Sequence, residues 1–350
     1  MPEAVTNRQR SNECGVAIAA TSHYLPTATM SNADLEAVMD TSDAWITSRT
    51  GISSRHRAAD DETVTTMASE ALAGALGNAS MRAADLDLLV VASVGSEMAC
   101  PSAACMILER LERVHGLGPS RAGAFDLTAA CSGFVYGLNI AESMMRSGPY
   151  KTIAVVGAEQ LTKTVEYTTQ GRGTAIIFGD GAGAAILKRT EDSTKGLLAQ
   201  SMHADGSRWG DLFIPREEPR DFPGGARGEE DPLPLGLMRM NGRSVFRFAV
   251  QTFGDVIQQT LDAAGLKADD VDHFVCHQSN VRILDAARDR FGLPEHKVGV
   301  NIQRVGNTSA ASVPILFDEL RSAGTISDGD RVMFVAFGGG LTWSASLWQL

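Results

Sequence analysis

Hydrophobic and polar positions along the chain follow two periods, and together they predict an α/β protein. Short, nearly continuous apolar runs predict buried strands, because a strand covered on both faces carries few polar residues. Longer segments with apolar residues three or four positions apart predict helices between these runs. We expect strands at 15–20, 86–92, 122–127, 152–157, 174–178, 184–187 and 274–276. We expect helices at 31–39, 64–76, 102–114, 131–147 and 245–264, a short one that carries Trp45, and one from Val281 onwards.

The order of these elements repeats in the second half of the chain. Three segments return in the same order: 84–90 as 269–275, 128–131 as 309–312, and 178–181 as 337–340. The offsets of about 160 to 185 residues are far longer than a solenoid repeat, so they indicate a duplicated domain. We expect two α/β units, residues 1–190 and 191–350, each with helices covering its sheet. A surface excursion rich in proline, glycine and charge spans 203–236.

Composition and charge restrict the class of protein. With 350 residues, of which 44% are hydrophobic and 21% charged, the chain has the make-up of a soluble globular protein with a large core. Its net charge of -11 argues against nucleic acid as a general partner, because phosphate binding needs a basic surface. No segment resembles a signal peptide or reaches the roughly 20 apolar residues that span a bilayer. The five cysteines include no CxxC pair, which favours a reducing compartment, so we expect a cytoplasmic protein without a membrane partner.

Cys131 stands where the predicted strand 122–127 turns into the next predicted helix. At such a position, unpaired backbone N–H groups and the positive end of the helix dipole favour a thiolate, so we expect the pKa of Cys131 to lie below that of a free cysteine. Two interpretations are open for this stretch: a reactive nucleophile, or a small buried residue, which is where most free cysteines lie. The stretch by itself favours neither.

Three other segments carry candidate chemistry. The loop 179–183 is rich in glycine, but a strand is expected after it, so we interpret it as a tight turn between strands and not as a phosphate-binding loop. His277 follows the strand 274–276, and the repeat places this strand end on the same side of the fold as the one that leads to Cys131, where ligands bind in α/β folds. Asn307 precedes the segment that echoes the Cys131 turn. Each of these two residues also has a structural interpretation, as a histidine at a strand end and as a turn or cap residue.

These motifs resemble those of the β-ketoacyl-acyl-carrier-protein synthase III family. The resemblance runs in order from about Gly15 to the C-terminus and rests on the segments 45–51, 101–105, 126–134, 172–174, 178–184, 277–280, 306–312 and 337–340. It implies the thiolase-like fold, two duplicated α/β halves in five layers (αβαβα), found as a homodimer. It also implies an acyltransferase that starts fatty-acid synthesis by condensing a short acyl-CoA primer with malonyl-acyl-carrier protein.

The family resemblance assigns roles to particular residues. Cys131 is expected to carry the acyl group, and the backbone N–H groups of Cys131 and Gly339 are expected to form an oxyanion hole. His277 and Asn307 are expected to donate hydrogen bonds to the enolate that forms on decarboxylation, which requires a neutral imidazole. The resemblance implies no metal and no cofactor, since acyl-CoA is a substrate.

Binding sites for the two substrates are implied in the same way. Trp45, Arg49 and Arg172 match positions that hold CoA, because an indole and a guanidinium suit stacking on adenine. For Trp45 the alternative is a core position in an amphipathic helix. For the acidic carrier protein, the expected contacts are Gln278, Ser279, Asn280, Val281, Arg282 and Arg247. Arg243, Arg288 and Arg290 would add positive charge, and a solvated helix face is the alternative interpretation.

The sequence departs from the family pattern at three places. Cys100, before Pro101, replaces a common phenylalanine that shapes the acyl pocket, which would admit a different or longer primer. The segment 341–344 and the length of the excursion 203–236 also differ. An acyltransferase or condensing enzyme of secondary metabolism is therefore the alternative function. A non-catalytic partner subunit is disfavoured, because Cys131, His277 and Asn307 are all present.

Overall fold

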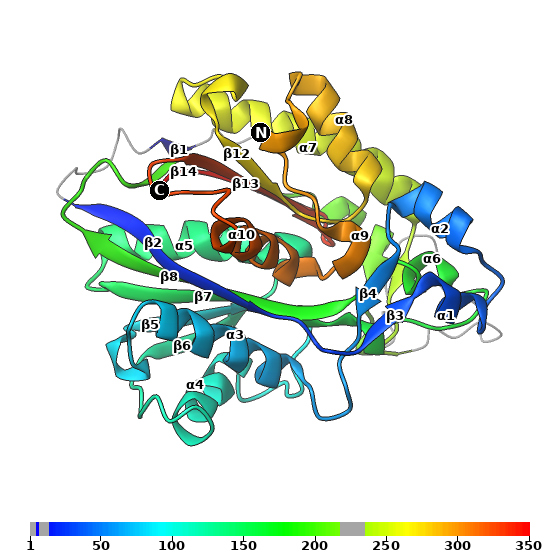
Figure 1. Ribbon diagram of the computed structural model, residues 1–350, viewed down its shortest axis with the longest axis horizontal. Coiled ribbons are helices and arrows are strands. Elements are labelled where there is room, and N and C mark those ends of the chain that lie inside the picture. Colours follow the sequence, from blue (N-terminus) through cyan, green and yellow to red (C-terminus); the bar gives the residue numbers. More distant parts are fainter. Residues whose placement is uncertain (1–4, 7–13, 218–234) are drawn as a thin grey trace.

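Two five-stranded sheets form the framework of the protein, whose computed structural model describes residues 5–6, 14–217 and 235–350 (Figure 1). The first sheet consists of β2 (Gly15–Tyr24), β5 (Leu88–Ala92), β6 (Gly123–Leu127), β7 (Thr152–Gln160) and β8 (Asp180–Thr190). Its strand order is β2-β8-β7-β5-β6. Strand β5 runs parallel to both β6 and β7, whereas β8 is antiparallel to β7 and β2.

The second sheet also has five strands and takes all of them except β1 from the other half of the chain. It consists of β1 (Val5–Thr6), β9 (Gly196–Ala204), β12 (His273–Cys276), β13 (Arg331–Gly338) and β14 (Thr342–Gln349). Its order is β1-β9-β14-β13-β12, and β12 and β13 are the parallel pair. The chain leaves the first sheet at Thr190, and all later strands of the two large sheets belong to the second. Strand β1 also belongs to the second sheet, although it precedes β2 in the chain. The division into units 1–190 and 191–350 stays a prediction.

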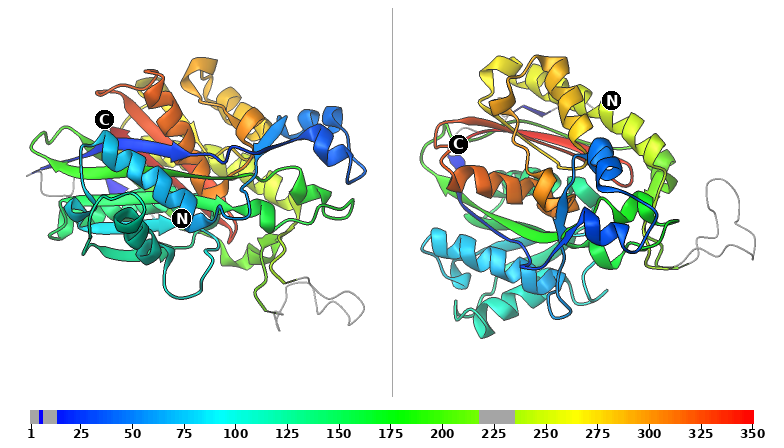
Figure 2. Two further views of the ribbon diagram at one scale, coloured as in Figure 1. Left: turned by 60° about the horizontal axis from the view of Figure 1, so that its bottom comes forward. Right: turned by 45° about the vertical axis from the view of Figure 1, so that its right-hand side comes forward.

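Helices cover both faces of both sheets, which gives five layers (Figures 1 and 2). The long helices are α3 (Val64–Asn78), α4 (Ala103–Arg113), α5 (Gly133–Ser147), α7 (Gly242–Ala264), α8 (Val281–Phe291) and α10 (Ser312–Ser322). Helices α3 and α4 cover the outer face of the first sheet, and α7 and α8 cover the outer face of the second. Helices α5 and α10 lie between the sheets. The predicted αβαβα thiolase-like arrangement is confirmed.

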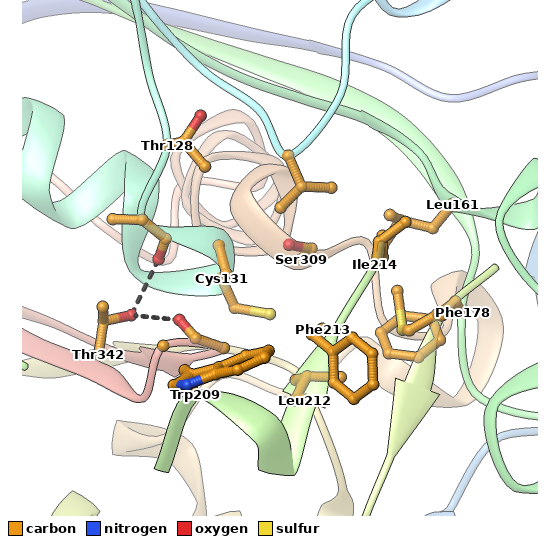
Figure 3. A pocket seen from close by; sticks show the side chains of 16 residues that line it. Thr128, Cys131, Leu161, Phe178, Trp209, Leu212, Phe213, Ile214, Ser309 and Thr342 are labelled. Atoms are coloured by element: carbon orange, nitrogen blue, oxygen red, sulfur yellow. Dashed lines mark hydrogen bonds between the residues drawn. The ribbon is translucent and has the colours of Figure 1, made fainter. Parts of the chain in front are cut away.

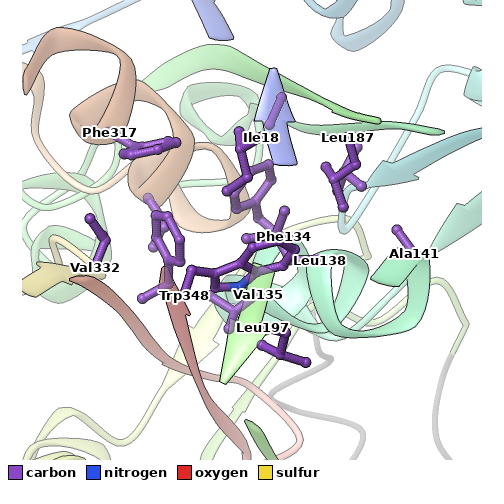
Figure 4. Packing of buried hydrophobic residues seen from close by; sticks show 14 of the residues in the cluster. Ile18, Phe134, Val135, Leu138, Ala141, Leu187, Leu197, Phe317, Val332 and Trp348 are labelled. Carbon is purple, nitrogen blue, oxygen red and sulfur yellow. The ribbon is translucent and has the colours of Figure 1, made fainter. Parts of the chain in front are cut away.

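The middle layer joins the two halves through one continuous apolar core (Figure 4). Phe317 of α10 meets Phe334 of β13 edge to face, with 4.8 Å between the ring centroids. Trp348 of β14 is fully buried in the same cluster, and its indole N–H donates to Ser346 Oγ at 2.7 Å. The apolar residues spaced along α5 from Phe134 onwards all face this core. Rigid packing on both sides of α5 therefore fixes the segment that precedes it.

Shorter elements complete the fold. They are α1 (Asn32–Glu36), α2 (Asp43–Thr50), α6 (Arg172–Ala175), α9 (Ile302–Val305), β3 (Thr29–Ser31), β4 (Ser54–His56), β10 (Leu212–Phe213) and β11 (Arg239–Met240). Helix α2 carries Trp45, as predicted. Helix α1 starts at the predicted capping box but ends at Glu36. Across residues 5–6, 14–217 and 235–350, every helix is too short or too polar to cross a membrane.

The internal repeat is present, with one change of register. The short turns η3 (Ala130–Ser132) and η8 (Ser309–Ala311) stand before α5 and α10, as the echo of 128–131 in 309–312 requires. Ala130 and Ser309 share a left-handed backbone, with φ of 46° and 48°. They are therefore the equivalent positions, so the counterpart of Cys131 is Ala310, two residues before the predicted one.

Three expectations for the first half are wrong. The predicted strand 174–178 is the short helix α6 followed by a turn. The glycines of 179–183 form no turn between strands: β8 begins at Asp180, and Gly183 lies within it, where a Cβ would stand 2.8 Å from the Ile315 nitrogen of α10. The interpretation that this segment holds no phosphate loop stays a prediction. Strand β6 is not buried on both faces, because it forms the edge of its sheet.

Candidate active site

The turn between β6 and α5 holds Cys131 against the second half of the chain. Ala130 has a left-handed backbone that reverses the chain just before Cys131. Thr342 Oγ1 donates to the carbonyl oxygen of Ala129 at 2.9 Å (Figure 3). A Cβ on Gly338 would stand 2.5 Å from the Cys131 nitrogen, so this approach requires glycine. The predicted oxyanion residue Gly339 lines the cavity beside Cys131, and its role stays a prediction.

The thiol of Cys131 is buried, with 6% of the residue exposed. Burial raises the pKa of Cys131 to about 12, although a hydrogen bond with the Ser309 side chain opposes this, and the charge of Glu159 raises it further. The expectation that the helix start lowers this pKa is therefore wrong. One residue of the η3 turn, Ser132, separates Cys131 from α5, and removal of water outweighs the helix dipole. A thiol of this kind needs a base before it can act as a nucleophile at neutral pH.

His277 lies at the end of β12 and is 1% exposed. Its Nδ1 is 2.7 Å from Ser312 Oγ, and the backbone N–H of Gln278 donates to the same oxygen at 3.3 Å. No other acceptor within the described residues contacts this hydroxyl, so its hydrogen points to Nδ1 and the imidazole proton lies on Nε2. Burial lowers the pKa of His277 to about 3. At neutral pH the ring is therefore an uncharged hydrogen-bond donor.

Asn307 lies in the segment between α9 and η8. Its backbone pairs with the segment before β8, since its N–H donates to the carbonyl oxygen of Ile177 at 3.0 Å. Its side-chain Oδ1 accepts from the Ser309 N–H at 2.8 Å. Because the oxygen is engaged in this way, the amide Nδ2 is the group available to a ligand.

Two cavities meet at Cys131. The first has a volume of about 360 Å³ and is mainly apolar (Figure 3). Its wall opposite Cys131 comes from the start of the 203–236 excursion, with Trp209, Leu212, Phe213 and Ile214. The second has a volume of about 470 Å³ and contains Cys131, His277 and Asn307 together. The structure thus brings the three predicted catalytic residues into one cavity.

Two of the three predicted CoA residues line the second cavity, and the third contacts one of them. Trp45 and Arg49 line it. The Arg172 guanidinium lies 5.1 Å from the centroid of the Trp45 ring and donates to the carbonyl oxygen of Asp40 at 2.6 Å. A ring stacked between the two groups needs about 7 Å, twice an ordinary contact distance. Arg172 must therefore move before adenine can lie between them.

The predicted carrier-protein residues fall into two groups. Gln278 is fully buried and uses its amide on four backbone groups, including the carbonyl oxygen of Cys276 at 2.9 Å and the N–H of Asn301 at 3.1 Å. The prediction that it contacts a carrier protein is wrong. Ser279, Asn280 and Arg282 line the second cavity, and Val281 follows as the first residue of α8. Asn280 caps α8 and donates to the Arg49 carbonyl oxygen at 2.9 Å.

The arginines near this cavity differ in their partners. Arg243, Arg247 and Arg282 are exposed, and none of the described carboxylates lies within ion-pair distance of them. Arg288 and Arg290 are instead paired with Asp285 at 3.0 Å and Asp255 at 2.8 Å. Of these arginines, Arg243 and Arg282 line the second cavity.

Cys100 does not line the acyl cavity of its own chain. It is exposed and absent from both cavities. A direct effect of Cys100 on the primer is therefore not supported within one chain. Among the described residues, no group of three or more His, Cys, Asp or Glu side chains could hold a metal ion.

Sequence reasoning missed two residues next to Cys131. Ser309 lies within a motif that drew attention only to Asn307, and Glu159 ends the apolar run of β7. Glu159 is fully buried and accepts from Ser309 Oγ at 2.9 Å. A single acid at the end of an otherwise apolar strand was the available signal, since buried carboxylates are rare without a specific partner.

Comparisons with known proteins give a consistent result. The family model for 3-oxoacyl-[acyl-carrier-protein (ACP)] synthase III matches residues 125–206, and the model for its C-terminal part matches residues 261–350. A β-ketoacyl-[acyl-carrier-protein] synthase III of Xanthomonas campestris is 43% identical over 330 residues, 94% of this chain and 97% of that protein. One of Geobacillus kaustophilus is 44% identical over 95% of this chain and 97% of its own length. The crystal structure of 3-oxoacyl-[acyl-carrier-protein] synthase III from Aquifex aeolicus is similar with a TM-score of 0.85 and 39% identity, over 96% of this chain and 100% of that one.

Proposed function

The chain belongs to the 3-oxoacyl-[acyl-carrier-protein] synthase III family and is a condensing acyltransferase, and we propose that it works through Cys131, His277 and Asn307 where its two cavities meet. One observation carries this proposal: the cavity that holds all three polar groups joins an apolar cavity at the cysteine. A thioester carbonyl at this junction would place its acyl chain among apolar side chains and its CoA arm towards Trp45 and Arg49.

In the first half-reaction the Cys131 thiolate attacks the carbonyl carbon of the acyl-CoA thioester. The backbone N–H groups of Cys131 and Gly339 stabilise the oxyanion, and CoA leaves as the acyl-cysteine forms. Trp45, Arg49 and a displaced Arg172 hold the CoA moiety. The close packing of Gly338 on the Cys131 backbone keeps the two N–H groups in place.

In the second half-reaction malonyl-acyl-carrier protein enters the cavity that CoA has left. His277 Nε2 and Asn307 Nδ2 donate to the thioester oxygen as carbon dioxide departs and the enolate forms. Both donors are neutral, since burial prevents protonation of the imidazole. The enolate carbon attacks the acyl-cysteine and expels the Cys131 thiolate. The exposed Arg247 and Arg282 attract the acidic carrier protein.

A homodimer in the cytoplasm is part of the proposal. Strand β6 ends its sheet without a further neighbour among the described strands, and a second copy would extend the sheet there. Met98 is more than half exposed on the loop after β5, which such a copy would cover. The cysteines of the chain are free, which suits a reducing compartment.

Acylation followed by condensation tests the function. The protein is incubated with acetyl-CoA and with longer acyl-CoAs, the adduct is located by peptide mass spectrometry, and malonyl-acyl-carrier protein is then added. We expect an acyl group on Cys131, its transfer to a β-ketoacyl product, and no adduct in Cys131→Ala. An adduct on a different cysteine would refute the mechanism. An adduct that never condenses would favour an acyltransferase of secondary metabolism.

A further inference from the structure

Glu159 and Ser309 form a buried, hydrogen-bonded pair, and Ser309 lines the same cavity as Cys131. Ser309 Oγ donates to Glu159 Oε1 at 2.9 Å, and Ser309 lines the apolar cavity together with Cys131 (Figure 3). The other contacts of the carboxylate are neutral donors: the N–H of Ala310 at 3.4 Å, the N–H of Val94 at 3.2 Å and Ser93 Oγ at 3.3 Å. No cation contacts this carboxylate within the part of the chain that the structure describes.

We propose that Glu159 is the base that deprotonates Cys131, with the Ser309 hydroxyl relaying the proton. The proposal rests on the acylation of Cys131 described above. Ser309 Oγ accepts the thiol proton as its own proton passes to Glu159 Oε1, because a hydroxyl can accept and donate at once. The alternative base, His277, is a poor one: its Nδ1 is engaged by Ser312, and its Nε2 carries a proton.

The proton balance closes over the two half-reactions. The Cys131 thiolate forms a C–S bond with the acyl carbon, the C–S bond to CoA breaks, and the CoA thiolate takes a proton from water. When condensation expels the Cys131 thiolate, Glu159 returns its proton through Ser309. One proton from water is thus consumed in each cycle, as a reaction that turns a malonyl carboxylate into carbon dioxide requires.

The relay predicts the direction of the pH dependence. Burial raises the pKa of Glu159 to about 7, and Cys131 is the titratable group that faces it. A raised pKa means that Glu159 is protonated, and unable to accept, below that pH. The acylation rate should therefore fall as the pH drops through about 7 and level off above it.

The test compares wild type, Glu159→Gln and Ser309→Ala. The pH dependence is measured both for Cys131 acylation in a single turnover and for its alkylation by iodoacetamide. We expect each variant to lose the inflection near pH 7 and to react about 10²- to 10⁴-fold more slowly at neutral pH. Alkylation needs no acyl-CoA. If the wild type is not acylated by acyl-CoA but its alkylation still shows the inflection near pH 7, the result therefore counts against the proposed function and not against the relay.

A purely electrostatic or structural Glu159 predicts the opposite sign. Its charge raises the pKa of Cys131, so Glu159→Gln would then be alkylated as fast as wild type or faster, and that result would overturn the relay.

Asp180→Asn is the matched control. Asp180 is an equally buried carboxylate on the neighbouring strand, held by the N–H of Ala58 at 2.8 Å and by Thr162. It should keep the wild-type pH profile, and loss of that profile in this control would equally contradict the relay.

Discussion

Burial determines the charge of the groups that meet at Cys131. It keeps His277 neutral and Cys131 protonated at neutral pH, and it leaves Glu159 close to the middle of its titration. In the proposed mechanism the two half-reactions therefore depend on different groups. Acylation needs a base for the thiol, whereas decarboxylation needs two neutral donors that do not titrate near neutrality.

This separation gives a prediction for His277 and Asn307. His277→Ala or Asn307→Ala should each lower the rate of decarboxylation by about 10²- to 10³-fold, because each removes one donor to the enolate oxygen. Release of labelled carbon dioxide from malonyl-acyl-carrier protein measures this step. Cys131 should still become acylated in both variants. A loss of acylation as large as the loss of decarboxylation would show that these residues act on the cysteine instead.

The sequence motifs predicted the identities of Cys131, His277 and Asn307 but not the environment that sets their charges. The lowered pKa expected for Cys131 came from the helix start alone, and the degree of burial could not be derived from that stretch. Ser309 and Ser312 lay inside a quoted motif, yet their partners are 150 and 35 residues away. Contacts at such separations depend on how the two halves pack, which no local pattern contains.

At the scale of elements, the segment 206–214 forms the far wall of the acyl cavity. Trp209 and Phe213 meet edge to face with 5.8 Å between their centroids, opposite Cys131 (Figure 3). At about 30 Å³ for a water-sized group, a cavity of about 360 Å³ holds far more than an acetyl group. In the proposed mechanism, therefore, this wall limits the length of the acyl chain, and the volume next to the sulfur does not.

Removing the Trp209 side chain from this cavity wall should change which acyl-CoA primer is preferred. In Trp209→Ala, kcat/KM for a ten-carbon acyl-CoA relative to acetyl-CoA should rise about tenfold or more, because apolar space is gained where the chain ends. Competition between the two acyl-CoAs measures the ratio. Trp45→Ala, in the wall of the other cavity, should weaken both substrates alike. An unchanged ratio in Trp209→Ala would place the acyl chain elsewhere.

Element predictions succeeded where the pattern was long and failed where it was short. Helices α3, α5 and α7 span many turns, so their apolar faces were evident. The run 174–178 is rich in β-branched residues but too short to distinguish a strand from the helix α6. Strand β6 was predicted as buried because its short apolar run is like that of an interior strand, and a local pattern does not show where a sheet ends. The predicted counterpart of Cys131 in the second half, Ser312, is two residues away from the structural one, Ala310. A sequence run of serine and alanine can be aligned with the Cys131 segment in more than one register.

At the scale of the whole molecule, the site exists only because the two halves approach closely. Gly157 of β7 lies directly against η8 of the other half, and a Cβ there would stand 2.2 Å from the Ala310 carbonyl oxygen. Glu159 follows two positions later on the same face of the strand and contacts Ser309. This contact therefore fixes the distance between the Cys131 turn and the segment that carries Asn307.

Gly157→Ala should move the halves apart. The clash is with backbone, which cannot rotate away, so we expect a loss of about 1–3 kcal/mol or more in the free energy of unfolding. Condensation should fall further than stability alone explains, since η8 and Asn307 shift together.

Gly77→Ala is the matched control, because Gly77 is exposed in the last turn of α3 with no atom within 4 Å of an added Cβ. That substitution should stabilise by about 0.4–1 kcal/mol and leave activity unchanged. Urea unfolding and the condensation assay on both variants test this, and a Gly157→Ala variant with wild-type stability and rate would show that the halves do not depend on this contact.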